Sequence, residues 1–142
     1  MQVSQIIRDK GGDVVTAAAE STLADAARVL ADRRIGAIVV MEGDTLRGIL
    51  SERDVVRALA RHGAAALDKT VAEFMTSKVI TCGFADTVDV LMEKMTSGRF
   101  RHLPVVEGGR LAGIISIGDV VKRRIEEVQL EAAQIREYIA TA

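Results

Sequence analysis

The sequence predicts an α/β (α+β) fold in which a β-α-β-β-α unit occurs twice and a longer helix follows the second copy. The first observation is a pair of similar nine-residue segments, GILSERDVV at Gly48–Val56 and GIISIGDVV at Gly113–Val121. The second is that the upstream turns repeat at the same offset, with Glu42–Gly43 matched by Glu107–Gly108. The third is composition: 49% of residues are hydrophobic but only 3% are aromatic, which suits close helix-on-sheet packing. Turns and cores that repeat together indicate a duplicated fold.

Each element of the first repeat follows from apolar periodicity and turn residues. The β-branched run at 14–16 predicts a short strand, and the segment STLADAARVLADRR predicts a helix with Ser21 or Thr22 as its N-cap. Apolar runs at 38–41 and 46–50, joined by the turn EGDT, predict a hairpin. A second helix is expected from Ser51 to about His62.

The second repeat shows the same order of elements. Strands are expected at 79–81, 103–106 and 111–115, with a helix at about 87–97 and a final helix after Ser116. A short helical segment precedes each repeat, at 3–7 and 71–75, and Asp9–Gly12 is a small insertion in the first. We therefore expect repeat 1 at 1–62 with its leading helical turn, a linker at 63–70, repeat 2 at 71–125 and a C-terminal helix extension at 126–142.

The final helix has an apolar stripe at alternating four- and three-residue steps, which is the spacing of a coiled-coil seam. The stripe consists of Val121, Ile125, Val128, Ala132, Ile135 and Ile139. It either packs on the core of its own chain or meets another subunit. The spacing alone leaves both interpretations open.

Composition excludes several classes of function. The formal net charge of −1 gives no overall field that would attract nucleic acid or an anionic membrane. The single cysteine, Cys82, excludes an intramolecular disulfide and is predicted to be a small core residue. Neither a signal peptide nor a membrane-spanning run of about 18 apolar residues is recognisable. We therefore expect a cytoplasmic protein that contacts neither a membrane nor nucleic acid.

Each duplicated segment contains the motif S-x-x-D, as Ser51 with Asp54 and Ser116 with Asp119. Before an apolar helical run this motif is a capping box, in which side chains and backbone N–H groups of the first turn satisfy one another. The same carboxylate, held rigidly on a first turn, can also accept both hydroxyls of a vicinal diol such as that of ribose. The two interpretations are compatible, and the motif alone does not choose between them.

The combination of motifs resembles a known family. A hairpin followed by G-h-h-S-x-x-D, repeated over about residues 3–124 and accompanied by the segment FRHLPVV at Phe100–Val106, is similar to a tandem pair of cystathionine β-synthase (CBS) domains, or Bateman module. This resemblance implies two small repeats packed about a pseudo-twofold axis. It also implies clefts between them that bind adenosine-containing ligands such as AMP, ATP, NAD or S-adenosylmethionine.

The resemblance also implies roles for individual residues. The acid and serine of each S-x-x-D motif would hold ribose, and Thr16 and Thr81, at the ends of the short first strands, would contact base or sugar. Phosphate would be met by basic residues. The candidates are Arg101 and His102 in the R-H-x-P-V segment, Arg53 within the first S-x-x-D loop, and, more weakly, Arg99, which Arg34 matches in the first repeat.

The cationic candidates are distributed unequally between the repeats. Gly36 and Ala37 stand where the second repeat has Arg101 and His102, and Gly118 stands where the first has Arg53. The two sets either serve one polyphosphate together or serve separate ligands. Two unequal nucleotide sites are therefore expected, and their occupancy is left open.

We predict a non-catalytic regulatory module that senses energy or redox state by binding AMP, ADP, ATP or NAD(H). Neither a nucleophile elbow, a P-loop nor a cluster of metal ligands is recognisable, so no catalytic residue, catalytic cofactor or metal is expected. A nucleotide that binds two conformations differently would shift their populations, acting through a homodimer or an unidentified effector protein. The alternative is a structural or protein-interaction module without a nucleotide ligand.

Overall fold

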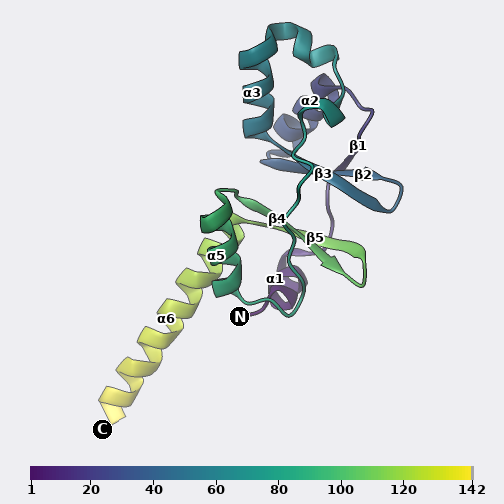
Figure 1. The fold of residues 1–142 in the computed structure, drawn as a ribbon. Helices are drawn as coiled ribbons and strands as arrows, with labels where there is room; N and C mark the ends of the chain where they lie inside the picture. Colours follow the sequence, from purple (N-terminus) through teal and green to yellow (C-terminus); the bar gives the residue numbers. More distant parts are fainter. Residues whose placement is uncertain (142) are drawn as a thin grey trace. The chain divides into compact units, whose positions relative to one another are not determined.

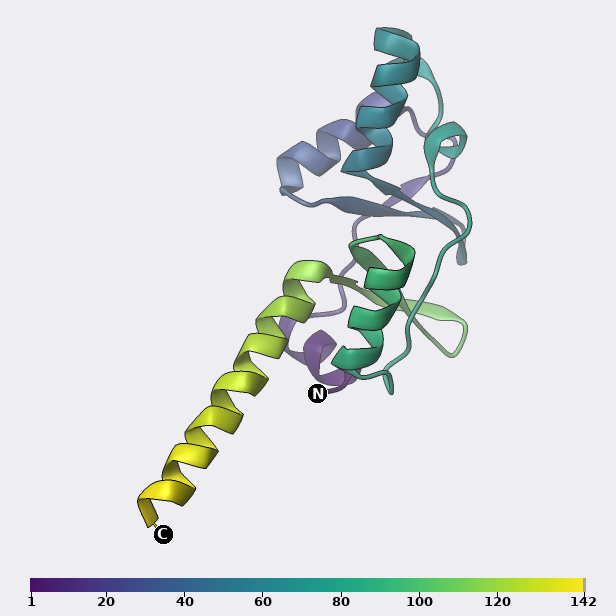
Figure 2. The ribbon, with the colours of Figure 1, turned by 60° about the vertical axis from the view of Figure 1, so that its left-hand side comes forward.

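The computed structural model describes residues 1–141 and confirms a mixed α/β fold with two small sheets and a long C-terminal helix (Figures 1 and 2). The chain divides into two compact units. The first unit contains residues 13–80 with the stretch 108–111, and the second unit contains residues 1–12, 81–107 and the segment that begins at 112. Along the chain the elements are α1 (Val3–Lys10), β1 (Thr16–Ala18), α2 (Leu23–Arg33), β2 (Ala37–Glu42), β3 (Thr45–Ser51), α3 (Glu52–His62), the 3-10 turn η1 (Gly63–Asp68), α4 (Val71–Phe74), α5 (Val88–Gly98), β4 (His102–Glu107), β5 (Arg110–Ser116) and α6 (Ile117–Thr141).

The sheet of the first unit has the order β1-β2-β3. Strand β1 runs parallel to β2, with Thr16 opposite Val39, and β3 runs antiparallel to β2, with Ser51 opposite Ala37. The central strand is buried because helices and neighbouring strands cover it, as its run of aliphatic side chains requires. The hydrophobic core of this unit consists of Leu23, Ala26, Leu30, Ile38, Val40, Leu50, Val55, Ala58, Ala66 and Val71.

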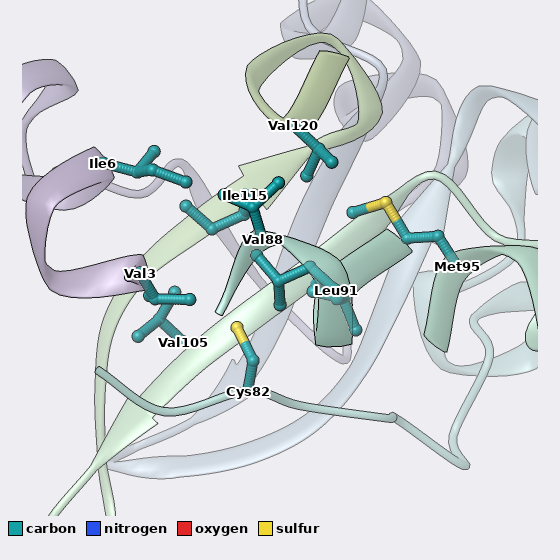
Figure 3. Close-up of a cluster of buried hydrophobic side chains, with 10 residues drawn as sticks. Val3, Ile6, Cys82, Val88, Leu91, Met95, Val105, Ile115 and Val120 are labelled. Atoms are coloured by element: carbon teal, nitrogen blue, oxygen red, sulfur yellow. The ribbon is translucent and has the colours of Figure 1, made fainter. Parts of the chain in front are cut away.

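The second unit is built around the strands β4 and β5. Figure 3 shows its core, in which side chains of α1, α5 and both strands converge. Cys82 is 4% exposed in this cluster, which confirms that it is a core residue. Burial, assisted by the nearby Asp86 carboxylate, raises the pKa of the Cys82 thiol to about 12, so the thiolate is disfavoured at neutral pH.

The first strand of each repeat differs from its predicted span. In the first unit the strand is Thr16–Ala18 instead of 14–16, although Val15 still accepts a hydrogen bond from the Val39 N–H at 3.3 Å. In the second unit the predicted strand at 79–81 is reduced to one isolated parallel bridge between Cys82 and Val105. The physical reason is Pro104, which stands where the first repeat has Val39 and has no N–H to donate.

The leading helices are exchanged between the repeats. The N–H of Val3 donates to the Asp86 carbonyl in the second repeat, at 2.9 Å. At the equivalent place, the N–H of Val71 donates to the Ser21 carbonyl in the first repeat, at 2.7 Å. Helix α1 thus belongs to the second unit and α4 to the first. The repeat boundaries along the sequence remain a prediction, but in space each unit contains the leading helix of the other repeat.

The glycine of the duplicated motif makes this docking possible. Strand β3 forms an antiparallel bridge with the segment after α4, through Ile49 and Thr76. A Cβ at the neighbouring Gly48 would lie 2.8 Å from the carbonyl oxygen of Thr76, so a larger residue would push the segment away. Gly113 has the corresponding close neighbour in Ile7 of α1.

Helix α6 extends well beyond the rest of its unit (Figures 1 and 2). Its first turns pack beside α5, and Val120 is fully buried. Most of the later residues are exposed, including the large apolar ones, and Ala132 is half-buried. None of the helices formed by residues 1–141 combines the length and apolar character that crossing a bilayer requires.

Candidate functional site

In the first unit, Ser51 and Asp54 form a complete capping box at the start of α3. Oδ2 of Asp54 accepts hydrogen bonds from the Ser51 N–H at 2.9 Å and from the Ser51 hydroxyl at 3.1 Å. In return the Asp54 N–H donates to Ser51 Oγ at 3.2 Å. Asp54 is only 7% exposed, and the Arg57 guanidinium lies 3.7 Å from its Oδ1. The carboxylate is therefore held in one orientation on the first turn.

In the second unit, Ser116 and Asp119 repeat the same arrangement at the start of α6. The Ser116 N–H and hydroxyl donate to Oδ2 of Asp119 at 2.9 and 3.0 Å, and the Asp119 N–H donates to Ser116 Oγ at 3.2 Å. This carboxylate has an additional partner, because the Lys10 ammonium donates to the same Oδ2 at 2.7 Å and to the Ile114 carbonyl at 2.9 Å. Lys10 comes from the insertion that distinguishes the first repeat.

The electrostatics of Asp119 reflect this lysine. Burial by itself would raise the pKa of Asp119, because it disfavours the charged form. Hydrogen bonds from Lys10 and Ser116, together with the charge of Lys10, outweigh that effect and hold the pKa below its ordinary value. Asp119 is consequently ionised at neutral pH and already partly neutralised by a cation from its own unit.

The capping prediction is therefore confirmed for both motifs, and capping does not use up the carboxylates. In both motifs Oδ2 takes the serine hydrogen bonds. A carboxylate has room for about four hydrogen bonds over its two oxygens, so Oδ1 can accept from a ligand without breaking the cap. The two interpretations of S-x-x-D can hold at once in this geometry.

The sheet of the first unit brings Thr16 to the same region as Ser51. Both strands flank β2, where Thr16 faces Val39 and Ser51 faces Ala37, two residues away. Strands β1 and β3 are two inter-strand spacings apart, which is about 10 Å. The corresponding Thr81 is half-buried and precedes the bridge residue Cys82, and its carbonyl accepts from the Lys94 ammonium at 3.0 Å.

The cationic candidates are placed unequally. Arg101 lies beside the second S-x-x-D motif, since its carbonyl accepts from the N–H of Ile117 at 2.8 Å, and its side chain is exposed. His102 begins β4 and is half-buried. Arg53 is exposed on the first turn of α3, next to Asp54. Arg99 caps α5 in the left-handed conformation, with φ of 56°.

Two lysines near these groups were missed by sequence reasoning. Lys10 reaches Asp119 across 109 residues, and Lys94 reaches the Thr81 carbonyl from α5. The only sequence signal for Lys10 was the insertion that contains it. Within residues 1–141, no group of three or more His, Cys, Asp or Glu side chains is arranged to hold a metal ion.

A family model of the CBS domain matches residues 3–61 and, again, residues 71–126. The chain belongs to the CBS-domain family. The mitochondrial CBS domain-containing protein CBSX3 of Arabidopsis thaliana is 32% identical over 146 residues, which is 96% of this chain and 71% of that protein. The crystal structure of the CBS-domain containing protein ATU1752 from Agrobacterium tumefaciens superposes with a TM-score of 0.86 at 50% identity. That alignment covers 87% of this chain and 99% of the other.

A further CBS-domain structure contains a nucleotide. The protein PAE2072 from Pyrobaculum aerophilum, solved in complex with AMP, superposes with a TM-score of 0.73 at 31% identity, over 84% of this chain and 89% of its own. Membership of this family fits a regulatory module that binds adenosine-containing ligands.

Proposed function

We propose that this CBS-domain pair is a non-catalytic regulatory module that binds an adenine nucleotide, AMP, ADP, ATP or NAD(H), and reports energy or redox state. The observation that carries the proposal is the ordered carboxylate of each S-x-x-D motif. Asp54 and Asp119 are fixed by serine hydrogen bonds to Oδ2 and retain Oδ1 as an acceptor for ribose hydroxyls.

The surroundings of each carboxylate support an adenosine ligand. In the first unit, Asp54 and Ser51 would take the ribose and Thr16, across the strand β2, would contact base or sugar. In the second unit, Asp119, Ser116 and Thr81 would have the same roles. Arg53, Arg101, His102 and, more weakly, Arg99 are the proposed phosphate ligands. The AMP-bound relative PAE2072 supports this class of ligand.

The two sites are proposed to be unequal. Asp119 already pairs with Lys10 at 2.7 Å, whereas the guanidinium of the half-exposed Arg57 lies 3.7 Å from Asp54. A ribose hydroxyl at Asp119 would approach an ionised carboxylate whose charge is already partly neutralised by Lys10. We therefore assign the tighter ribose contact to Asp54.

The proposed output is a population shift in a cytoplasmic homodimer or in a complex with an effector protein. A nucleotide that binds one conformation more tightly than another shifts the populations of the two conformations. The shift is at most the ratio of its affinities for them. The family match supports a regulatory role and gives no catalytic family.

Calorimetric titration tests the proposal. AMP, ADP, ATP, NAD, NADH and S-adenosylmethionine are titrated into the parent chain, Asp54→Ala and Asp119→Ala. We expect AMP to bind below millimolar concentration and Asp54→Ala to weaken it about 10- to 100-fold, because a charge-assisted pair of hydrogen bonds contributes about 1.5–3 kcal/mol. Asp119→Ala should weaken it less.

Two outcomes would contradict the proposal in different ways. If none of the six compounds binds below millimolar concentration, the chain is a structural or protein-interaction module without a nucleotide ligand. If a nucleotide binds equally well to both alanine variants, the module binds ligand but the ribose assignment is wrong. A circular dichroism spectrum of each variant serves as the folding control, since both aspartates also cap helices.

A further inference from the structure

Helix α6 carries an apolar seam that its own unit leaves uncovered. The large side chains of the seam are between 46% and 67% exposed, and they are Val121, Ile125, Val128, Ile135 and Ile139. Ala132 completes the four- and three-residue spacing. A contiguous apolar stripe of this length on a soluble protein marks a surface for another macromolecule.

The seam lies beside the face of α6 that contacts its own unit. That face contains the buried Val120, Arg123, which pairs with Asp9 at 2.8 Å, and Arg124, which lies 3.5 Å from Asp89. At 100° per residue, the seam lies roughly a quarter of a turn around the helix from this face. The seam residues themselves make none of these contacts, and only Arg124 of that face stands at the edge of the seam.

The outer part of α6 gains little from packing within its own unit. The match to the CBS-domain model ends at residue 126, whereas the helix continues to Thr141. The exposed part beyond Val128 is roughly three and a half turns long, and most helical stability in proteins comes from tertiary packing of an amphipathic face. Burial of the seam would supply the missing stabilisation.

We propose that α6 pairs with α6 of a second copy of this chain as a parallel, in-register, two-stranded coiled coil. In heptad notation Ile125, Ala132 and Ile139 occupy a positions, and Val121, Val128 and Ile135 occupy d positions. The partner is a second copy because one flanking pair, Glu131 and Arg136, has opposite charges that two copies of the same helix bring together.

The flanking charges also decide the direction of the partner helix. In a parallel pair a g residue faces the e residue of the next heptad on the other strand, so Glu131 faces Arg136 of the second copy, twice by symmetry. An antiparallel pair that overlaps all six seam layers would place Glu131 opposite Glu131 and Lys122 opposite Arg136. Opposite charges favour the parallel arrangement, and like charges disfavour the other.

The central layer sets the number of strands. Large β-branched side chains at both a and d positions favour three or four strands. Here the middle a position is Ala132, whose small side chain allows two helices to approach closely but would leave a void at the axis of a three-stranded core.

Cysteine cross-linking tests the parallel arrangement with a matched control. In the full chain, Ala132→Cys places a thiol on the seam, and Ala133→Cys places one on the adjacent outward face. The native Cys82 is buried and has a raised pKa, so it should not react. In a glutathione redox buffer we expect Ala132→Cys to form covalent dimers at least about tenfold faster than Ala133→Cys, because only the seam thiols face each other. Equal rates would overturn the coiled coil.

A mixture of Ala132→Cys and Val128→Cys chains tests the opposite direction. Cross-linking between these two positions, without dimers of Ala132→Cys alone, would show an antiparallel pair and overturn the proposal. Sedimentation equilibrium of the parent chain should give twice the chain mass. A mass of three chains would overturn the two-stranded assignment.

Charge reversal gives a further test, read as the cross-linking rate in the Ala132→Cys background. Arg136→Glu should slow dimer formation roughly three- to tenfold in a parallel pair, because Glu131 then faces a second acid. In an antiparallel pair position 132 faces position 128 of the other helix, so this rate would already be low, and Arg136→Glu, which would then face Lys122, would not slow it further. Adding Glu131→Arg should restore the parent rate, which excludes a general loss of helix as the cause of the first effect.

Discussion

At the scale of single residues, two carboxylates with the same local sequence have unlike surroundings. Asp54 and Asp119 form the same three hydrogen bonds with their serines. The difference comes from Lys10, whose ammonium donates to the Asp119 carboxylate. An incoming hydroxyl would therefore meet a carboxylate that already has a cationic partner. The insertion in the first repeat thus makes the two candidate ribose sites inequivalent.

We predict that Lys10→Met raises the pKa of Asp119 and destabilises the second unit. The folded-state pKa of Asp119 lies below its unfolded value, so its contribution to stability is present above about pH 4 and disappears as the pH falls through the folded pKa. Losing this ion pair, whose side chains are 31% and 23% exposed, should cost about 1 kcal/mol at pH 7. Side-chain carboxyl NMR titration, and urea unfolding at pH 7 and at a pH below the folded-state pKa that this titration gives, measure both effects.

The control for this prediction is Arg57→Met at the equivalent carboxylate of the first unit. The Arg57 side chain is 53% exposed and its guanidinium lies 3.7 Å from Asp54, so its removal should change the free energy of unfolding by less than about 0.5 kcal/mol. Equal losses for the two variants, or a Lys10→Met loss that persists below the folded-state pKa of Asp119 found by the titration, would show that the Lys10–Asp119 pair is not the cause.

At the scale of secondary-structure elements, local signals predicted the helices and hairpin strands better than the first strands. The S-x-x-D caps and the apolar hairpin runs lie within a few residues, so the sequence contains their full cause. The strand expected at 79–81 instead depends on its partner strand. Its β-branched residues favour a strand, but Pro104 opposite cannot donate the hydrogen bond that Val39 donates in the first repeat.

We therefore predict that Pro104→Val extends the first strand of the second unit. Valine has the N–H that proline lacks, and the equivalent Val39 donates to the Val15 carbonyl at 3.3 Å. The new amide at position 104 should be protected from hydrogen exchange at least about 100-fold relative to an unstructured amide, because an amide in a buried ladder exchanges only when the unit opens. Exchange measured by NMR gives this number directly.

The reciprocal substitution, Val39→Pro, is the matched control. It removes a donor from a fully buried central strand and should destabilise the first unit by at least about 1–3 kcal/mol, the cost of leaving a buried acceptor unsatisfied. If the new amide in the Pro104→Val chain exchanges as fast as an exposed one, something other than the proline shortens the strand.

At the scale of the whole molecule, the least predictable feature is which unit contains each leading helix. The repeat pattern places residues 3–7 before the first repeat and 71–75 before the second, and nothing local indicates where they pack. The contacts that decide it are long-range, such as the Val3 N–H with Asp86 and the Lys10 ammonium with Asp119. Periodicity indicates which face of a segment is buried but not which element that face packs against. Neither the exchange of the leading helices nor the Lys10–Asp119 contact could therefore be predicted from the sequence.

The exchange predicts a crossed pattern of destabilisation by two matched substitutions. Val3 and Val71 are both fully buried, the first in the core of the second unit and the second in the core of the first unit. Each valine-to-alanine change should cost about 2 kcal/mol through lost burial and a small cavity. Hydrogen exchange at the amides of each unit then reports where that loss is felt.

We expect Val3→Ala to speed exchange roughly 30-fold in residues 82–106 and 113–120, with a smaller effect in residues 14–75, since about 2 kcal/mol corresponds to about a factor of 30. Val71→Ala should do the reverse, although this residue lies next to the second repeat along the chain. The reason is that the unit whose core has lost methyl groups unfolds locally more often, and its amides exchange during that unfolding. If each substitution instead weakened the repeat that follows it in sequence, the leading helices would not be exchanged. Equal acceleration in both units by both variants would show that the two cores open together.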